Sequence, residues 1–70
     1  MKLTVNGRER DFPQLETDRG LHHLIELLQL KEDRVAVERN GDIVARAKWV
    51  EVQLEEGDKL EVVQFVGGGY

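Results

Sequence analysis

Seventy residues make one small domain that depends on a single core, because so short a chain buries only about 60% of the surface that its unfolded form exposes. The chain has no cysteine, which excludes disulfides, thiolate catalysis and cysteine-ligated zinc. Fourteen acidic residues against ten basic ones give a net charge of −4, so nucleic acid and anionic membranes are poor partners. No apolar stretch approaches the roughly 20 residues of a membrane span, and the N-terminus lacks a signal-peptide core, which indicates a cytoplasmic protein.

The first twelve residues predict a β-hairpin. Met1, Leu3 and Val5 alternate with polar residues, and Asn6-Gly7 is a strong two-residue turn signal. Pairing across that turn places Arg8 and Arg10 on the apolar face. Either the turn is longer, or the return strand is an edge strand whose arginine stems lie over apolar surface. Pro13 ends this strand, since proline cannot donate to a ladder.

A helix is predicted from about Asp18 to Leu30, because the hydrophobic period changes there from 2 to 3.6. Thr17 or Asp18 can cap its N-terminus. The apolar stripe follows the spacing i, i+3, i+4 and i+7 and is widened by two further leucines. Its members are Leu21, Leu24, Ile25, Leu27, Leu28 and Leu30.

The rest of the chain returns to strands. Val35 and Val37 alternate with polar residues, Asn40-Gly41 is a second tight turn, and Glu56-Gly57-Asp58 turns the chain into a last strand over residues 60–66. One helix can cover one face of a small mixed sheet, with the last strand parallel to the first through a right-handed crossover. This order predicts an α+β fold of the β-grasp, or ubiquitin-like, type: a domain over residues 1–66 and a flexible glycine-rich tail over residues 67–70.

The last strand is apolar on both faces. Leu60 and Val62 share one face, and Val63 and Phe65 share the other. A half-covered sheet normally has a polar outer face, so the second pair needs an explanation. Two explanations are open: cover by the segment 45–54, or a partner-docking patch made by Val63 and Phe65.

The tail, Gly67-Gly68-Gly69-Tyr70, follows the last strand without a spacer. Glycine loses the most freedom on ordering, so we expect a mobile arm that can thread a narrow channel. Four extended residues reach roughly 13 Å, far enough to carry a carboxyl group into a partner's active site. The tail is therefore interpreted as a substrate handle.

Other candidate sites are weaker, and we expect no catalytic residue and no metal site. His22 and Glu26 share a helix face, but two ligands without a third are usually a coincidence. Glu56 and Asp58 form a carboxylate pair that typically bonds nearby backbone in such a turn. Trp49 is expected to close the open end of the sheet rather than mark a ligand pocket.

Three segments resemble the bacterial ThiS family of sulfur carriers in thiamine biosynthesis. They are the ending Phe65-Val66-Gly67-Gly68-Gly69, the turn Glu56-Gly57-Asp58 and the run from Val37 to Trp49. The run is the best discriminator, because molybdopterin-type carriers and ubiquitin-like modifiers share the glycine ending. The chain departs from the family at Ala45, often proline, and at Tyr70, which follows the terminal glycine.

The resemblance implies a non-enzymatic carrier that binds no cofactor. A ThiF-like adenylyltransferase would use ATP to activate Gly69, a persulfide enzyme would supply sulfur, and a thiazole synthase would accept it from the thiocarboxylate. Gly67 and Gly68 would thread the partner's channel, and a peptidase would first remove Tyr70. Two alternatives stay open: a sulfur carrier for cysteine or molybdopterin synthesis, and a ubiquitin-like interaction module or modifier without sulfur chemistry.

Overall fold

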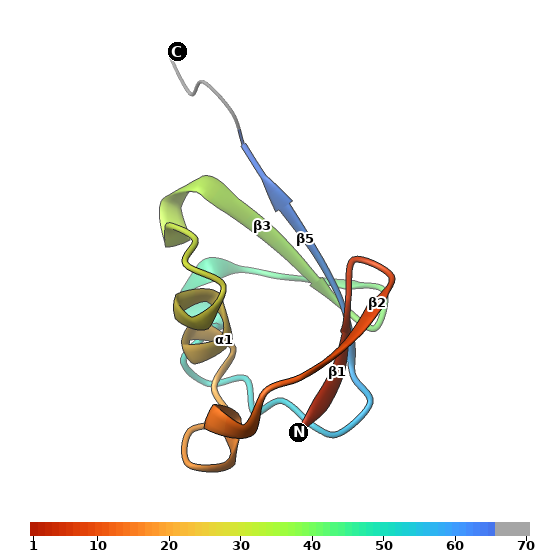
Figure 1. Cartoon of the computed structure of the whole chain (residues 1–70). Coiled ribbons are helices and arrows are strands. Elements are labelled where there is room, and N and C mark those ends of the chain that lie inside the picture. Colours follow the sequence, from red (N-terminus) through yellow and green to blue (C-terminus); the bar gives the residue numbers. More distant parts are fainter. Residues whose placement is uncertain (66–70) are drawn as a thin grey trace.

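The computed structural model describes residues 1–65 and contains one helix and five strands among them (Figure 1). The strands are β1 (Lys2–Val5), β2 (Arg8–Asp11), β3 (Val35–Arg39), β4 (Asp42–Val44) and β5 (Lys59–Gln64), and the helix is α1 (Leu21–Leu27). Three short 3₁₀ turns, Pro13–Glu16, Glu32–Arg34 and Arg46–Lys48, connect them. Residues 66–70, and with them the predicted tail, lie outside the described residues.

The sheet has the order β2-β1-β5-β3-β4, so β5 is its central strand. β5 runs parallel to β1, with Val5 opposite Leu60, and antiparallel to β3. The helix lies across one face of this mixed sheet (Figure 1). The predicted β-grasp topology, with the first and last strands adjacent and parallel, is therefore confirmed.

The core lies between the helix and the inner face of the sheet. Alternate residues of β1, β3 and β5 point into it, as the period-2 pattern predicts. The largest side chain in the core is that of Trp49, which is 2% exposed and donates a hydrogen bond from Nε1 to the Val44 carbonyl oxygen at 3.0 Å. The buried apolar residues are Leu3, Val5, Phe12, Leu15, Leu21, Leu24, Ile25, Val35, Val37, Trp49, Leu54, Leu60 and Val62.

The opening hairpin uses the two-residue turn, so the edge-strand interpretation is the right one. Asn6 and Gly7 both have positive φ, and Val5 pairs with Arg8. The Arg10 guanidinium carbon lies 5.1 Å from the centre of the Phe12 ring, so this arginine covers apolar surface at the edge of the sheet.

The helix is shorter at both ends than the predicted span from Asp18 to Leu30, and neither Thr17 nor Asp18 caps it. Gly20 occupies the N-cap without a side-chain cap, and the Leu21 N–H donates to the Val52 carbonyl oxygen instead. Asp18 Oδ1 accepts from the Gly20 N–H at 3.0 Å, which is a local turn before the helix. A tertiary contact with the segment before β5 thus replaces the predicted cap.

The helix ends in a Schellman motif centred on a glutamine. Gln29 has φ +60°, its N–H donates to the Glu26 carbonyl oxygen, and the Leu30 N–H donates to the Ile25 carbonyl oxygen. Glycine usually occupies this left-handed position, so the leucine periodicity alone overestimates the length of the helix.

The side chain of Asp58 organises the turn that leads into β5. The residue is 7% exposed, and its carboxylate accepts hydrogen bonds from the Glu55 N–H at 2.9 Å, Arg39 Nε at 2.9 Å and Asn40 Nδ2 at 3.1 Å. Burial alone would raise the pKa of Asp58, but these donors outweigh it and hold the pKa below its ordinary value of 3.8. The carboxylate thereby ties the start of β5 to the end of β3.

Because the folded state lowers the pKa of Asp58, the stability from its carboxylate is complete above the ordinary value of 3.8 and is lost as the pH falls below it. We expect Asp58→Ala to lower the free energy of unfolding by about 2 to 3 kcal/mol near neutral pH, measured by urea denaturation. The difference from the wild type should shrink below pH 3.8. Asp42→Ala, at an exposed carboxylate, is the control and should change stability by less than about 0.5 kcal/mol. A constant difference across the acid range would contradict this role of the carboxylate.

Candidate functional site

The central strand β5 presents one buried and one exposed apolar face. Leu60 and Val62 are 1% and 9% exposed and belong to the core, whereas Val63 and Phe65 are 57% and 50% exposed. The sequence predicted this division of faces. Adjacent exposed apolar side chains at a central strand mark a candidate interaction surface.

The segment 45–54 does not cover this outer face. Its two largest apolar residues, Trp49 and Leu54, are buried in the core cluster, and the Leu54 N–H donates to the Arg19 carbonyl oxygen. Of the two explanations open at the level of the sequence, loop cover is therefore wrong. Because Val63 and Phe65 are exposed, the remaining explanation is that they dock a partner, and this stays a proposal.

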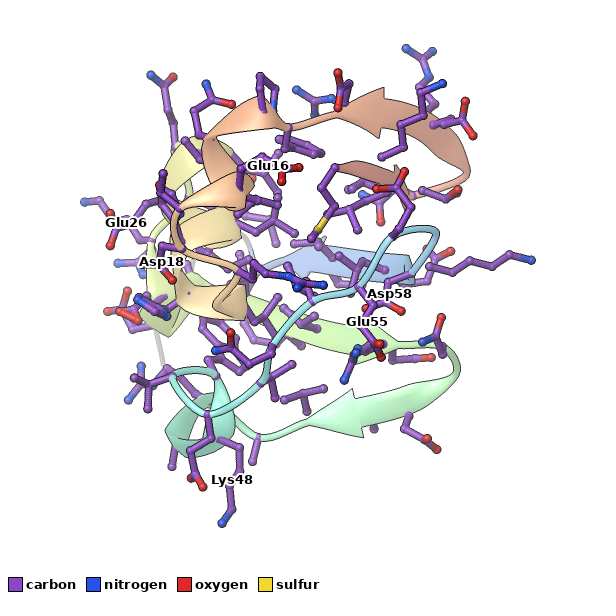
Figure 2. The ribbon with its side chains drawn as sticks, turned by 90° about the horizontal axis from the view of Figure 1, so that it is seen from below. Glu16, Asp18, Glu26, Lys48, Glu55 and Asp58 are labelled. Carbon is purple, nitrogen blue, oxygen red and sulfur yellow. The ribbon has the colours of Figure 1, made fainter. Side chains whose placement is uncertain are left out.

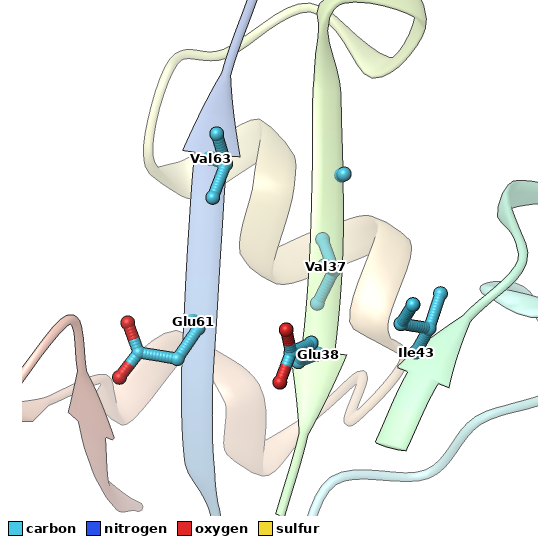
Figure 3. A pocket seen from close by; sticks show the side chains of 6 residues that line it. Val37, Glu38, Ile43, Glu61 and Val63 are labelled. Carbon is cyan, nitrogen blue, oxygen red and sulfur yellow. The ribbon is translucent and has the colours of Figure 1, made fainter. Parts of the chain in front are cut away.

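A shallow hollow of about 90 Å³ lies on the same face, over β3, β4 and β5 (Figure 3). Its apolar contributors include Val63 and Ile43, and Ile43 is 80% exposed. Glu38 and Glu61 also line it and occupy paired positions in the β3–β5 register. The outer face thus combines apolar side chains with two adjacent carboxylates.

The C-terminal end of β5 is held by hydrogen bonds on both of its edges. The Asn6 side chain closes the β1 side, where its Oδ1 accepts from the Val62 N–H at 2.7 Å and its Nδ2 donates to the Val62 carbonyl oxygen at 3.1 Å. On the β3 side, the Phe65 N–H donates to the Arg34 carbonyl oxygen at 2.7 Å. The backbone therefore stays paired from β5 as far as Phe65, the last described residue.

Sequence reasoning missed Asn6, Ile43, Glu38 and Glu61. The sequence predicts Asn6 only as a turn residue, although amide side chains commonly bond backbone. Ile43 and Glu38 could have been placed, because the two-residue turn Asn40-Gly41 puts Ile43 opposite Glu38 and the burial of Val37 turns Glu38 outward. Only the register of β3 with β5 places Glu61 beside Glu38.

The structure shows the positions and contacts of the residues in the weaker candidate sites. Glu26 is exposed on α1, and His22 Nε2 lies 3.5 Å from Asp18 Oδ2. Asp58 and Glu55 lie together at the turn before β5, away from α1 (Figure 2). Asp58 bonds the nearby Glu55 N–H, as expected for a turn carboxylate, whereas Glu56 Oε2 accepts from the distant Lys2 N–H on β1 at 3.0 Å. Among residues 1–65 no group of three His, Asp or Glu side chains could hold a metal ion.

The predicted handle residues Gly67, Gly68, Gly69 and Tyr70 lie outside the described residues, so their assignment stays a prediction. None of the helices in the described part of the chain is long and apolar enough to cross a membrane. The expected cytoplasmic location also stays a prediction.

Comparison with known proteins gives one consistent family. Residues 3–69 match the model of the ThiS family. The sulfur carrier protein ThiS of Bacillus subtilis is 37% identical over 68 residues, which cover 96% of this chain and 98% of that protein. The crystal structure of the thiamine biosynthesis protein ThiS from Geobacter metallireducens has a TM-score of 0.79 at 29% identity and covers 99% of this chain and 100% of that one.

Longer proteins also contain a matching region. A thiazole synthase of Paramagnetospirillum magneticum is 44% identical over 69 residues, and one of Magnetococcus marinus is 39% identical over 69 residues. Each match covers 99% of this chain but only 20% of the relative, so the chain spans about a fifth of the length of these two proteins.

Proposed function

Because this chain belongs to the ThiS family, we propose that it is a sulfur carrier whose terminal glycine, Gly69, is converted into a thiocarboxylate. The observation that carries the proposal is the end-to-end match with a protein named as a sulfur carrier, together with a family match that extends to residue 69. The chain acts as a protein co-substrate, and the catalytic groups and ATP belong to its partners.

The chemistry at Gly69 takes three steps. A carboxylate is a poor electrophile, so an adenylyltransferase of the ThiF type joins it to AMP from ATP and releases pyrophosphate. The terminal sulfur of a persulfide then attacks the acyl carbon and displaces AMP. A thiol cleaves the S–S bond of the resulting acyl disulfide, which leaves the thiocarboxylate on Gly69.

Glycine suits these steps because it has no Cβ, so the backbone can approach a nucleotide phosphate and a sulfur donor closely. Gly67 and Gly68 extend this property along the channel that leads to the partner's active site. In this sequence, however, Tyr70 follows Gly69, and its ring is too wide for a channel of glycine width. The family match ends at residue 69, which supports removal of Tyr70 by a peptidase before activation.

Two relatives named thiazole synthases contain a region similar to this chain, which favours a thiazole synthase as the sulfur acceptor. Delivery of sulfur from Gly69 to the thiazole precursor then makes the carrier part of thiamine biosynthesis. Val63 and Phe65, which are exposed beside the start of the tail, are proposed to dock the activating partner.

The maturation step is tested with two purified chains, one ending at Tyr70 and one at Gly69. Each is incubated with the adenylyltransferase, ATP and sodium sulfide, which supplies sulfur directly, and is measured by intact mass. Only the chain ending at Gly69 should gain the mass of one sulfur in place of one oxygen. Equal conversion of both chains, with tyrosine retained, would show that no maturation is needed. Conversion of neither would contradict the sulfur-carrier function.

Deletion of residues 67–70 should abolish ATP-pyrophosphate exchange with the adenylyltransferase, because no carboxylate then reaches the nucleotide. Among residues 1–65 the last buried residue is Val62, so the deletion should cost less than about 1 kcal/mol and shift the melting temperature by only a few degrees. A large loss of stability in the calorimeter would mean that the tail is structural.

Phe65→Ala should weaken binding to the adenylyltransferase by about 1 to 3 kcal/mol, because aromatic anchors dominate interface energies. Phe65 is 50% exposed in the free carrier, so the variant should remain folded. Val50→Ala is the matched control, since Val50 is an exposed apolar residue remote in sequence from β5. Calorimetric titration with unchanged affinity for folded Phe65→Ala would remove Phe65 from the docking surface.

A further inference from the structure

The outer face of the sheet contains a charge arrangement that folding alone does not explain. Glu38 on β3 and Glu61 on β5 are directly opposite each other, and both are exposed. Like charges at directly opposite positions destabilise a sheet. No ion pair within residues 1–65 includes either carboxylate, although Lys59 lies two residues before Glu61 on the same face of β5.

Apolar side chains flank the two carboxylates. Ile43 lies opposite Glu38 on β4, and Val63 follows Glu61 on the same face of β5. These residues line one hollow, in which both carboxylates point away from the core (Figure 3). A partner that covers Ile43 and Val63 also removes water from the carboxylates, and this strengthens their attraction for a cation.

We propose that this hollow receives one arginine side chain from the adenylyltransferase, held between Glu38 and Glu61 and packed against Ile43 and Val63. The inference rests on the proposed function, and it adds the chemistry that the partner must present. Arginine fits better than lysine because its planar guanidinium offers five donors, enough for both carboxylates, and its apolar faces and stem pack against aliphatic groups. Arginine is also enriched at protein interfaces.

The charge of the chain favours this occupant over a second copy of the chain. In a dimer formed through this face, each copy would contribute Glu38 and Glu61, and four carboxylates would come together. The net charge of −4 on each copy would add to this repulsion. A basic partner surface is instead attracted over a distance, and the attraction falls as salt is added. A dimer through this face, detected by sedimentation, would contradict the inference.

The test uses Glu38→Gln/Glu61→Gln in the chain ending at Gly69, because glutamine keeps the shape and removes the charge. Binding to the adenylyltransferase should weaken about tenfold at low salt, and the salt dependence of the affinity should become smaller. Glu26→Gln, an exposed carboxylate on α1, is the control and should change affinity by less than about twofold. The melting temperature of the double variant should stay equal or rise by up to about 4 °C, because the repulsion is removed.

A second measurement identifies the bound residue. Arginines of the adenylyltransferase are modified with phenylglyoxal and located by mass spectrometry, with either carrier present. The wild-type carrier should protect one arginine that the double variant leaves reactive. Equal protection, equal affinity of the two carriers, or no binding by the wild type would overturn the inference. A wild-type carrier that binds but gains no thiocarboxylate would instead contradict the proposed function.

Discussion

The hydrogen-bonded carboxylate of Asp58 is the contact on which the arrangement of β5 depends. It accepts from Arg39, Asn40 and the Glu55 N–H, and so joins the turn before β5 to the end of β3. A shift of β5 by one residue would exchange its two faces, which would bury Val63 and expose Leu60. The turn therefore determines which side chains stabilise the core and which remain available to a partner.

This division separates stability from function along a single strand. One face of β5 supplies Leu60 and Val62 to the core, and the other presents Glu61 and Val63 to solvent, with the exposed Phe65 just after the strand. The Asn6 side chain keeps the far part of β5 paired after β1 has ended. A strand that is paired on both edges thus precedes the glycine segment on which the proposed chemistry takes place.

Much of the fold followed from local patterns. The period change, the Asn-Gly turns and the two faces of β5 predicted the topology, because each reports a short-range preference of the chain. The two ends of α1 could not be predicted from these patterns. At the N-terminus the Leu21 N–H donates to the Val52 carbonyl oxygen, and at the C-terminus Gln29 adopts the left-handed conformation usual for glycine. The pairing of two carboxylates in the hollow over β3, β4 and β5 could not be predicted for another reason. Glu38 and Glu61 are far apart in sequence, and only the register of β3 with β5 makes them neighbours.

The most direct measurement is a structure of the carrier ending at Gly69 in complex with its adenylyltransferase and a non-hydrolysable ATP analogue. The account predicts that the Gly69 carboxylate lies next to the α-phosphate, that Val63 and Phe65 are buried in the interface, and that an arginine of the partner lies between Glu38 and Glu61. Docking through α1 with the sheet face left in solvent, or a Gly69 carboxylate remote from the nucleotide, would contradict it.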